Sequence, residues 1–100
     1  MIKHIVLWKL AEEADGHDKK GNYQRIKEGL EALVGIVPGL REAEVGFNEN
    51  GGEYDAVLVS LFDSREALAA YDVHPAHQAV RQLVKKVRLA RTSVDYELFP

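Results

Sequence analysis

The sequence contains no cysteine, one methionine, one tryptophan and only three prolines in its 100 residues. Without cysteine there is neither a disulfide framework nor a thiolate zinc site, two common ways of stabilising a small domain. This composition is compatible with a reducing compartment, and we expect a soluble, cytoplasmic protein. The N-terminal apolar run is too short and too interrupted, by Lys3 and His4, for a signal peptide or a membrane span.

Positive charge is also scarce. The formal net charge is -3 and the sequence pI is about 5.8, whereas nucleic-acid-binding domains usually carry a basic patch, so we expect no nucleic-acid partner. The sequence has no glycine-rich phosphate loop, no nucleophile elbow and no Ser-His-Asp pattern. One basic cluster stands near the expected end of a helix, where cations complement the helix dipole: Lys85, Lys86, Arg88 and Arg91.

The length allows one domain, and we treat residues 1–100 as a single unit. Hydrophobic residues make up 46% and charged residues 29%, as in an ordinary soluble globular protein. A domain of this size buries only about two-thirds of the surface that its unfolded chain exposes. Because neither a disulfide nor a zinc site is available, we expect association between subunits to supply the extra burial.

Apolar periodicity predicts the order strand, helix, strand, strand, helix, strand. The first strand, residues 2–10, carries large apolar groups on both faces, so we expect both faces to be covered. Its alternation places Ile2, His4, Val6, Trp8 and Leu10 on one face, and Lys3, Ile5, Leu7 and Lys9 on the other.

The first helix is predicted over residues 18–37, because apolar residues recur there at spacings of three and four. Asp18 is its expected N-cap, and Pro38-Gly39 ends it. Two strands, residues 40–47 and 54–62, follow and are joined by a hairpin loop rich in asparagine and glycine.

The second helix is predicted in two pieces. Asp63 and Glu66 form a capping-box pattern at its start. Pro75 disfavours helix at His74 and is well placed as the first residue of a new helix, which continues to Val87. The remaining segments are a polar loop over residues 11–17 and a last strand over residues 92–99.

This order predicts an α+β domain of the ferredoxin-like βαββαβ type, a four-stranded antiparallel sheet with both helices on one face. We expect the uncovered face to carry Val6, Trp8 and either Phe47 or Phe62. An apolar face of that size usually marks an interface, and a second copy of the sheet would cover it by two-fold pairing. The facing sheets of such a homodimer would enclose a pocket.

Several segments resemble the stress-responsive A/B barrel (Dabb) family. They are Lys-His-Ile-Val-Leu-Trp-Lys over residues 3–9, Ile-Val-Pro-Gly-Leu over residues 36–40, Tyr-Asp-Val-His-Pro-Ala-His over residues 71–77 and Val-Asp-Tyr over residues 94–96. The second-helix segment is the most specific of them. The resemblance covers nearly the whole chain and implies a dimeric α+β barrel, in agreement with the order of elements.

The resemblance also implies a set of site residues. A plant polyketide cyclase of this family closes its substrate by an aldol condensation without a cofactor, and matching positions make His77 the general base, Tyr71 its partner and His4 a helping histidine from the first strand. Val6, Trp8 and His74 would line the substrate pocket, with His74 in a structural role. The cyclase has a further tyrosine where this chain has Leu30, so its substrate is not carried over.

The residues taken by themselves leave two interpretations of each group open. His4 shares a face with Val6 and Trp8, and would either relay a proton or form a hydrogen bond within a core or dimer contact. His77 lies near a helix N-terminus, which disfavours the imidazolium; it would act as a neutral base or as an ordinary polar group. Tyr71 would donate a hydrogen bond to a developing enolate or simply pack in the core.

We expect no cofactor. His74 and His77 are three residues apart, but no carboxylate-histidine motif accompanies them, so a transition-metal site is not predicted. Some plant members of the family hold magnesium on main-chain carbonyls at the end of the first helix. The resemblance places that position near Val34, Val37 and Leu40, and the sequence leaves open whether a cation binds there.

Two functions fit these observations. The first is a homodimer with a pocket for a small apolar or aromatic carbonyl compound, with cofactor-free acid/base catalysis such as a cyclase, isomerase, lyase or monooxygenase-like step. The alternative is a non-catalytic stress or binding protein whose barrel serves only for association. The sequence leaves open whether the protein is an enzyme.

Overall fold

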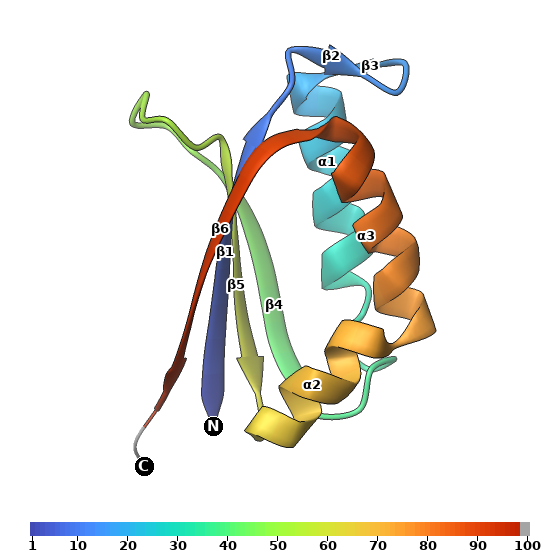
Figure 1. Cartoon of the computed structure of the whole chain (residues 1–100), viewed down its shortest axis with the longest axis vertical. Coiled ribbons are helices and arrows are strands. Elements are labelled where there is room, and N and C mark those ends of the chain that lie inside the picture. Colours follow the sequence, from blue (N-terminus) through green and yellow to red (C-terminus); the bar gives the residue numbers. More distant parts are fainter. Residues whose placement is uncertain (99–100) are drawn as a thin grey trace.

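In a computed structural model, which describes residues 1–98, helices cover one face of a four-stranded antiparallel sheet (Figure 1). The sheet order is β4-β5-β1-β6, and the predicted ferredoxin-like α+β fold is confirmed. The strands of the sheet are β1 (Ile2–Leu10), β4 (Leu40–Phe47), β5 (Ala56–Phe62) and β6 (Arg88–Glu97). The helices are α1 (Lys19–Glu31), α2 (Arg65–Val73) and α3 (Pro75–Val87), and a small hairpin consists of β2 (Glu13–Ala14) and β3 (His17–Asp18).

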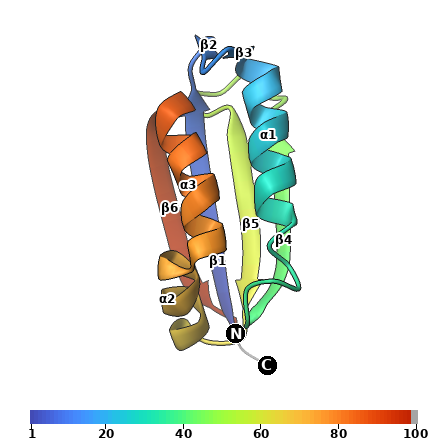
Figure 2. The ribbon, with the colours of Figure 1, turned by 90° about the vertical axis from the view of Figure 1, so that its right-hand side faces the viewer.

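The helices α1 and α3 lie side by side across the sheet, α1 on the β4 side and α3 on the β6 side (Figure 2). Gly29 of α1 allows this approach, because a Cβ atom there would lie 3.1 Å from a methyl group of Val80 on α3. The glycine therefore serves helix-helix contact rather than the packing of a helix onto the sheet.

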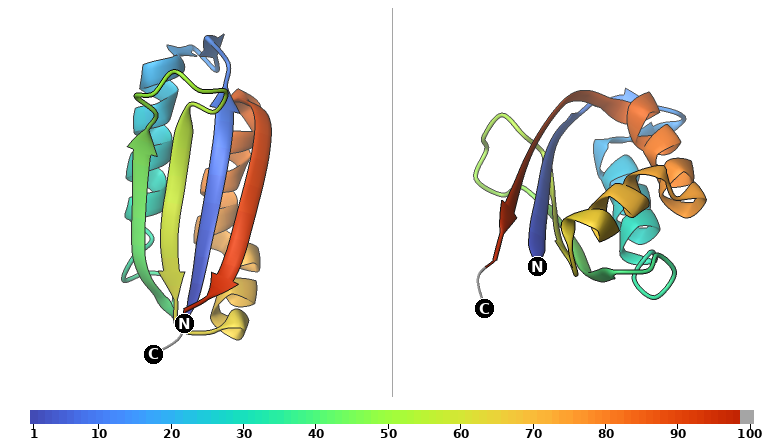
Figure 3. Two further views of the ribbon diagram at one scale, coloured as in Figure 1. Left: turned by 90° about the vertical axis from the view of Figure 1, so that its left-hand side faces the viewer. Right: turned by 60° about the horizontal axis from the view of Figure 1, so that its bottom comes forward.

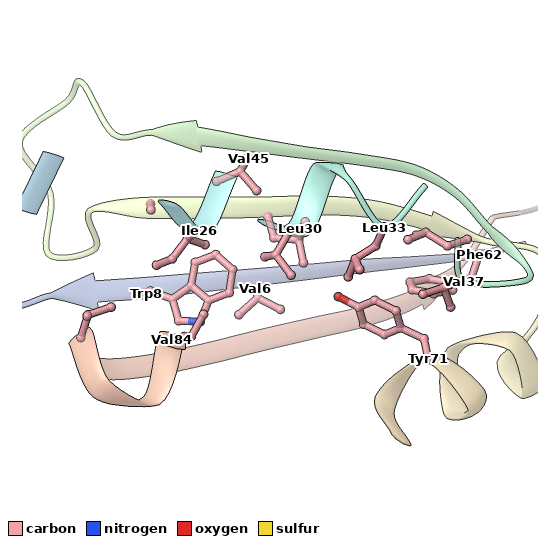
Figure 4. Packing of buried hydrophobic residues seen from close by; sticks show 14 of the residues in the cluster. Val6, Trp8, Ile26, Leu30, Leu33, Val37, Val45, Phe62, Tyr71 and Val84 are labelled. Atoms are coloured by element: carbon pink, nitrogen blue, oxygen red, sulfur yellow. The ribbon is translucent and has the colours of Figure 1, made fainter. Parts of the chain in front are cut away.

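The helix-covered face of β1 carries Val6 and Trp8, which are 2% and 4% exposed. Figure 4 shows both side chains clustered with Ile26 and Leu30 of α1. The expectation that Val6 and Trp8 lie on the uncovered face was therefore wrong. Phe62 is also buried on the covered side. The alternation itself was correct, but both faces of β1 are apolar, and alternation cannot tell which face the helices cover.

The opposite face of the sheet has no helix in front of it within residues 1–98 (Figure 3, left). Its centre is an apolar row across three strands, because Ile5 is paired with Val59 of β5 and with Val94 of β6. Val94 is 59% exposed, and Tyr96 farther along β6 is 43% exposed. An open apolar face therefore exists, as predicted, but it consists of the other set of residues.

Helix α1 begins where predicted and ends earlier. The Asp18 carboxylate accepts the Gly21 N–H at 2.7 Å and caps the helix. The helix stops at Glu31 rather than at residue 37, because the following segment turns through Gly35 and Gly39, which have φ values of +89° and +82°. These left-handed conformations are open to glycine at little cost.

Helix α2 is capped by Ser64 and not by the predicted Asp63. The Ser64 hydroxyl accepts the Ala67 N–H at 3.1 Å, whereas the Asp63 carboxylate bonds to Arg41 on β4. Both residues are good N-caps. Because the Asp63 carboxylate is paired with Arg41, the Ser64 hydroxyl caps the helix instead.

The remaining differences concern short segments. The segment predicted as a polar loop contains the β2–β3 hairpin, which is held by the fully buried Asn22, whose side-chain amide donates to the Ala14 carbonyl. Strand β5 begins at Ala56 rather than at residue 54. Strand β6 begins at Arg88, directly after α3, and the predicted end of this strand at Phe99 lies outside the described residues. Among the described helices, none is long and apolar enough to cross a membrane.

The seating of α2 on the turn after α1 generates the first prediction. A Cβ atom at Gly39 would lie 2.5 Å from the Cβ of Ala67 on α2, whereas a Cβ at Gly35 would meet nothing within 4 Å. Both glycines have positive φ, so Gly35→Ala measures the conformational cost alone, about 1–2 kcal/mol. We expect Gly39→Ala to lower the free energy of unfolding by roughly 1–3 kcal/mol more, because of the clash. Urea unfolding of the two variants measures the difference, and equal losses would contradict the close contact.

Candidate functional site

A cleft of about 590 Å³ opens between the covered face of the sheet and helices α2 and α3. Its sheet side consists of residues from β1, β5 and β6, and Leu30 of α1 contributes one apolar wall. The cleft lies within a single chain, and the predicted site residues that line it face the helices of their own chain. The pocket between two facing sheets stays a prediction. The apolar lining comprises Val6, Trp8, Leu30, Leu58, Leu68, Ala69 and Val84.

The junction of α2 and α3 orients the site. His74 has an extended conformation, with φ -67° and ψ 133°, and Pro75 starts α3. The Nδ1 atom of His74 accepts the Ala76 N–H at 3.0 Å, so the histidine caps α3. The side chain of His74 does not line the cleft, although the pocket assignment included it. His74 therefore has a structural role as the cap of α3. The helix break at this residue lets Tyr71 before it and His77 after it both line the cleft.

Tyr71 is held inside the protein and has its ring stacked on that of His77. The ring centroids are 3.9 Å apart with an interplanar angle of 26°, and Phe62 packs edge-on at 4.9 Å. Tyr71 is 3% exposed, yet its hydroxyl makes no hydrogen bond within residues 1–98, and no fully enclosed polar side-chain atom there lacks a partner. The hydroxyl therefore opens onto the cleft that Tyr71 lines.

Burial raises the pKa of Tyr71 well above its ordinary value, and the negative charge of Asp72 raises it further, while the positive charge of Arg91 acts in the opposite direction. Tyr71 is therefore a neutral phenol at physiological pH. Its chemical capacity in the cleft is to donate a hydrogen bond to an oxygen atom of a bound molecule.

His77 is poised as a proton acceptor. Its Nδ1 lies 3.4 Å from the carbonyl oxygen of Asp72, and because a carbonyl only accepts, Nδ1 carries the proton and Nε2 keeps a free lone pair. Burial lowers the pKa of His77, and the Asp72 carbonyl opposes this effect in part. The imidazole is thus neutral near pH 7. A neutral His77 was predicted from its place near a helix N-terminus, whereas burial is the main cause of its lowered pKa.

His4 occupies the sheet side of the cleft and has a partner that the sequence analysis missed. Its Nδ1 bonds to the carboxylate of Asp95, the residue directly opposite on β6. A carboxylate that accepts from Nδ1 fixes the ring tautomer and leaves Nε2 free. The His4 and Tyr71 rings are 6.4 Å apart between centroids. Antiparallel pairing of the first and last strands is the signal that would have identified Asp95.

Residues from four elements therefore meet in one cleft: His4, Val6 and Trp8 from β1, Tyr71 from α2, His77 from α3 and Asp95 from β6. Five of these were predicted as site residues. His17 lies elsewhere, in β3, with its Nδ1 bonded to the Asp15 carbonyl.

No group of three or more histidine, aspartate or glutamate side chains in the described part of the chain could hold a metal ion. In the turn after α1, where the resemblance places a main-chain cation site, the Val37 carbonyl accepts the Leu40 N–H at 3.3 Å. We assign no cation to the turn.

The geometry of the cleft supports one kind of chemistry. A neutral imidazole with a free Nε2 stands beside a phenol that donates, within apolar walls that strengthen electrostatic interactions. Such a pair can remove a proton from carbon next to a carbonyl group while a hydrogen bond stabilises the oxygen on which charge develops.

Comparison with known proteins places the chain in a family. An uncharacterised protein of Streptomyces coelicolor is 38% identical over 84 residues, which are 79% of this chain and 81% of that protein. A dimeric protein of unknown function with a ferredoxin-like fold from Bacteroides fragilis is 35% identical, with a TM-score of 0.87 over 97% of this chain and 95% of that chain. Hydroxynitrile lyase from Passiflora edulis is 17% identical and shares the fold alone, with a TM-score of 0.78 over 99% of this chain and 96% of that chain.

The family model for the stress-responsive A/B barrel domain matches residues 2–98. This match covers nearly the whole chain and agrees with the fold and with the dimeric neighbour. The chain belongs to the stress-responsive A/B barrel (Dabb) family.

Proposed function

We propose that the protein is a homodimer in which each subunit binds a small apolar or aromatic carbonyl compound and transfers a proton on it without a cofactor. The observation that carries the proposal is the Tyr71–His77 stack. It combines, in one cleft, a phenol without a hydrogen-bond partner among residues 1–98 and a neutral imidazole with a free Nε2.

The proposed step begins with removal of a proton from the carbon next to the carbonyl group by His77 Nε2. The electron pair of that C–H bond moves into an enolate, and the Tyr71 hydroxyl donates a hydrogen bond to its oxygen. In a cyclisation, the enolate carbon attacks a second carbonyl of the same molecule, and the imidazolium returns its proton to the alkoxide oxygen that forms. In an isomerisation, a neighbouring C=C bond extends the enolate, and the imidazolium returns its proton to the far carbon of that extended enolate. His4, held by Asp95, faces this reaction from the sheet and would orient the carbonyl or relay a proton.

A homodimer through the open sheet face accounts for the exposed apolar row that includes Ile5, Val59 and Val94. The relative from Bacteroides fragilis, which is 35% identical, is described as dimeric. Pairing of two such faces would bury these residues and close the barrel around a core between the sheets. The clefts would lie on the outer sides of that core, one in each subunit.

The alternative is a binding or stress protein without turnover. One observation favours it: Tyr71 is 3% exposed and packs against Phe62, as a purely structural ring would. The two proposals differ in whether removal of the hydroxyl or of the imidazole abolishes a chemical step while leaving the fold intact.

Proton transfer can be tested without knowledge of the natural substrate. We expect the protein to accelerate exchange of the methyl protons of acetophenone with deuterium oxide, as followed by proton NMR. His77→Gln and Tyr71→Phe should each lower the accelerated rate by about 10²-fold or more. His17→Gln, which changes a histidine outside the cleft, is the matched control and should leave the rate unchanged. Wild-type rates in folded His77→Gln and Tyr71→Phe would reject catalysis by this pair and favour the alternative.

The burial of His77 has a second consequence, for stability. A histidine whose pKa is lowered by folding stabilises the protein above its unfolded pKa of about 6.5, and this contribution is lost as the pH falls through the lower pKa of the folded state. We expect the free energy of unfolding to fall between about pH 7 and pH 5, and to fall less in His77→Gln. Urea unfolding at both pH values gives the two slopes. His17→Gln should follow the wild type; an unchanged slope in His77→Gln would show that His77 titrates normally.

The interface can be tested by placing a charge at the centre of the open face. Val59→Lys should convert the dimer to a monomer in sedimentation velocity experiments, because a buried unpaired ammonium group is costly. Val73→Lys is the matched control, since Val73 lies at the end of α2 and is 71% exposed. The control should remain dimeric. A dimeric Val59→Lys variant would show that the subunits do not associate through the open sheet face.

A further inference from the structure

The charge of the cleft is opposite to that of the whole chain. Two carboxylates, Asp72 and Asp95, line it together with five cationic side chains, so its formal charge is +3 while the chain as a whole carries -3. The cations are Arg65, Arg81, Lys85, Arg88 and Arg91. A cleft with a net positive charge raises the local concentration of anionic ligands.

The fold turns these cations toward the cleft in two ways. Arg81 and Lys85 follow His77 on α3 at intervals of four residues, so all three lie along one face of the helix. Arg91 is directly opposite Trp8 in the antiparallel register of β6 with β1, and opposite residues point to the same side of a sheet. The basic cluster was predicted to complement a helix dipole, yet of its four members only Lys86 does not line the cleft.

Some of these charges are already balanced. Arg81 lies 3.2 Å from the Asp72 carboxylate, Arg65 lies 3.9 Å from that of Glu97, and Asp95 is bonded to His4. Lys85, Arg88 and Arg91 form no ion pair with any carboxylate of residues 1–98, and the contact of Arg91 with the Ser93 hydroxyl is long, at 3.5 Å. The uncompensated positive charge is therefore concentrated near Trp8.

Trp8 adds a neutral donor at the same place. It is 4% exposed, its indole N–H has no acceptor among the described residues, and no fully enclosed polar side-chain atom there lacks a partner. The N–H must then open onto the cleft, and Figure 4 shows its nitrogen on the side of the ring nearest Val84, another lining residue. A buried donor left without an internal acceptor is the kind of group that a ligand satisfies.

We propose that the ligand is an organic carboxylate as well as a carbonyl compound, and this inference rests on the proposed function. The acid group binds at the end of the cleft formed by Lys85, Arg88, Arg91 and the Trp8 N–H. The carbonyl group lies at the other end, beside the stacked rings of Tyr71 and His77. Guanidinium groups pair with carboxylates by two parallel hydrogen bonds, which makes arginine well suited to this recognition.

The two ends are separated along β1. His4 and Trp8 are four residues apart, or about 13 Å along the backbone of an extended strand. The gap that the ligand spans is shorter than this, because the side chains of Tyr71, His77 and the arginines reach into the cleft from its two ends. We therefore expect several bonds between the carbonyl and acid groups of the ligand. The apolar residues Val6, Leu30 and Leu58 lie along the cleft and would contact the connecting carbon chain or ring.

The test compares an acid with its neutral counterpart. Because Trp8 is the only tryptophan and lines the cleft, its fluorescence reports binding directly. The probes are benzoylbutyrate and its primary amide, which differ in charge and hardly in size. We expect the acid to bind at least about tenfold more tightly than the amide at low salt, with a preference that shrinks as ionic strength rises. Benzoylpropionate and benzoylvalerate test the length dependence.

Variants separate the recognition of charge from the fold. Arg91→Gln, and independently Arg88→Gln, should reduce the preference for the acid while leaving the affinity for the amide unchanged. Lys86→Gln removes one positive charge next to the cleft without lining it, and should retain the full preference. Circular dichroism spectra confirm that each variant is folded, and either arginine variant suffices if the other fails to fold.

Four results would overturn the inference. Equal affinities for acid and amide, or an undiminished preference in both folded arginine variants, would show that the cations are only a solvated rim, and the proposed function would stand. Failure of both probes to bind, with acetophenone exchange still accelerated, would also reject the carboxylate and spare the proton transfer. Failure of both binding and exchange would reject the proposed function together with the inference.

Discussion

The candidate site depends on one local constraint, the helix break at His74-Pro75. In a continuous helix, residues 71 and 77 would point about 120° apart, because each residue adds 100°. In this chain the rings of Tyr71 and His77 are stacked at 3.9 Å. Pro75 disfavours helix at the preceding residue, and His74 stabilises the restart by accepting the Ala76 N–H. The proline and the cap together convert two positions on different helix faces into one pair.

The second constraint is the register of the central strand. β1 is paired with both β5 and β6, so each of His4, Val6 and Trp8 on its covered face has a partner residue on either side. On β6 these neighbours are Arg91, Ser93 and Asp95, all polar and exposed. An edge strand that presents polar groups toward the helices leaves room beside the apolar core, and the cleft occupies that room. A shift of one residue would turn both Asp95 and Arg91 away from it.

The elements and their order could be read from the sequence because they depend on local patterns. Asp18 as a cap, Pro75 as a helix start and the alternation in β1 are each properties of a few neighbouring residues. The orientation of β1 depends instead on which face the helices cover, and its two faces are nearly equal in apolar character. This ambiguity is the reason why Val6 and Trp8 were predicted on the open face, although they lie on the covered face.

The same distinction applies to the site. His77, Tyr71 and His4 were identified from a family resemblance, and the sequence alone left each with a structural alternative. Their partners depend on contacts distant in sequence, and these were missed: Asp95 lies 91 residues from His4, and Arg91 approaches Trp8 only through strand pairing. The basic cluster was assigned to a helix end because its spacing fits that role. Only the tertiary structure turns three of its four members toward the cleft.

The charges of the cleft are consistent with the proposed chemistry. An enolate formed beside Tyr71 would be opposed by burial and by the Asp72 charge, the two influences that raise the pKa of the phenol itself. A ligand carboxylate close to Tyr71 would add further repulsion. Placing the acid group at the Trp8 end separates it from the reacting oxygen, and Arg81 is already bonded to Asp72 between the two ends. Recognition of an anion and stabilisation of a new negative charge can therefore coexist in one cleft only because they occupy different ends of it.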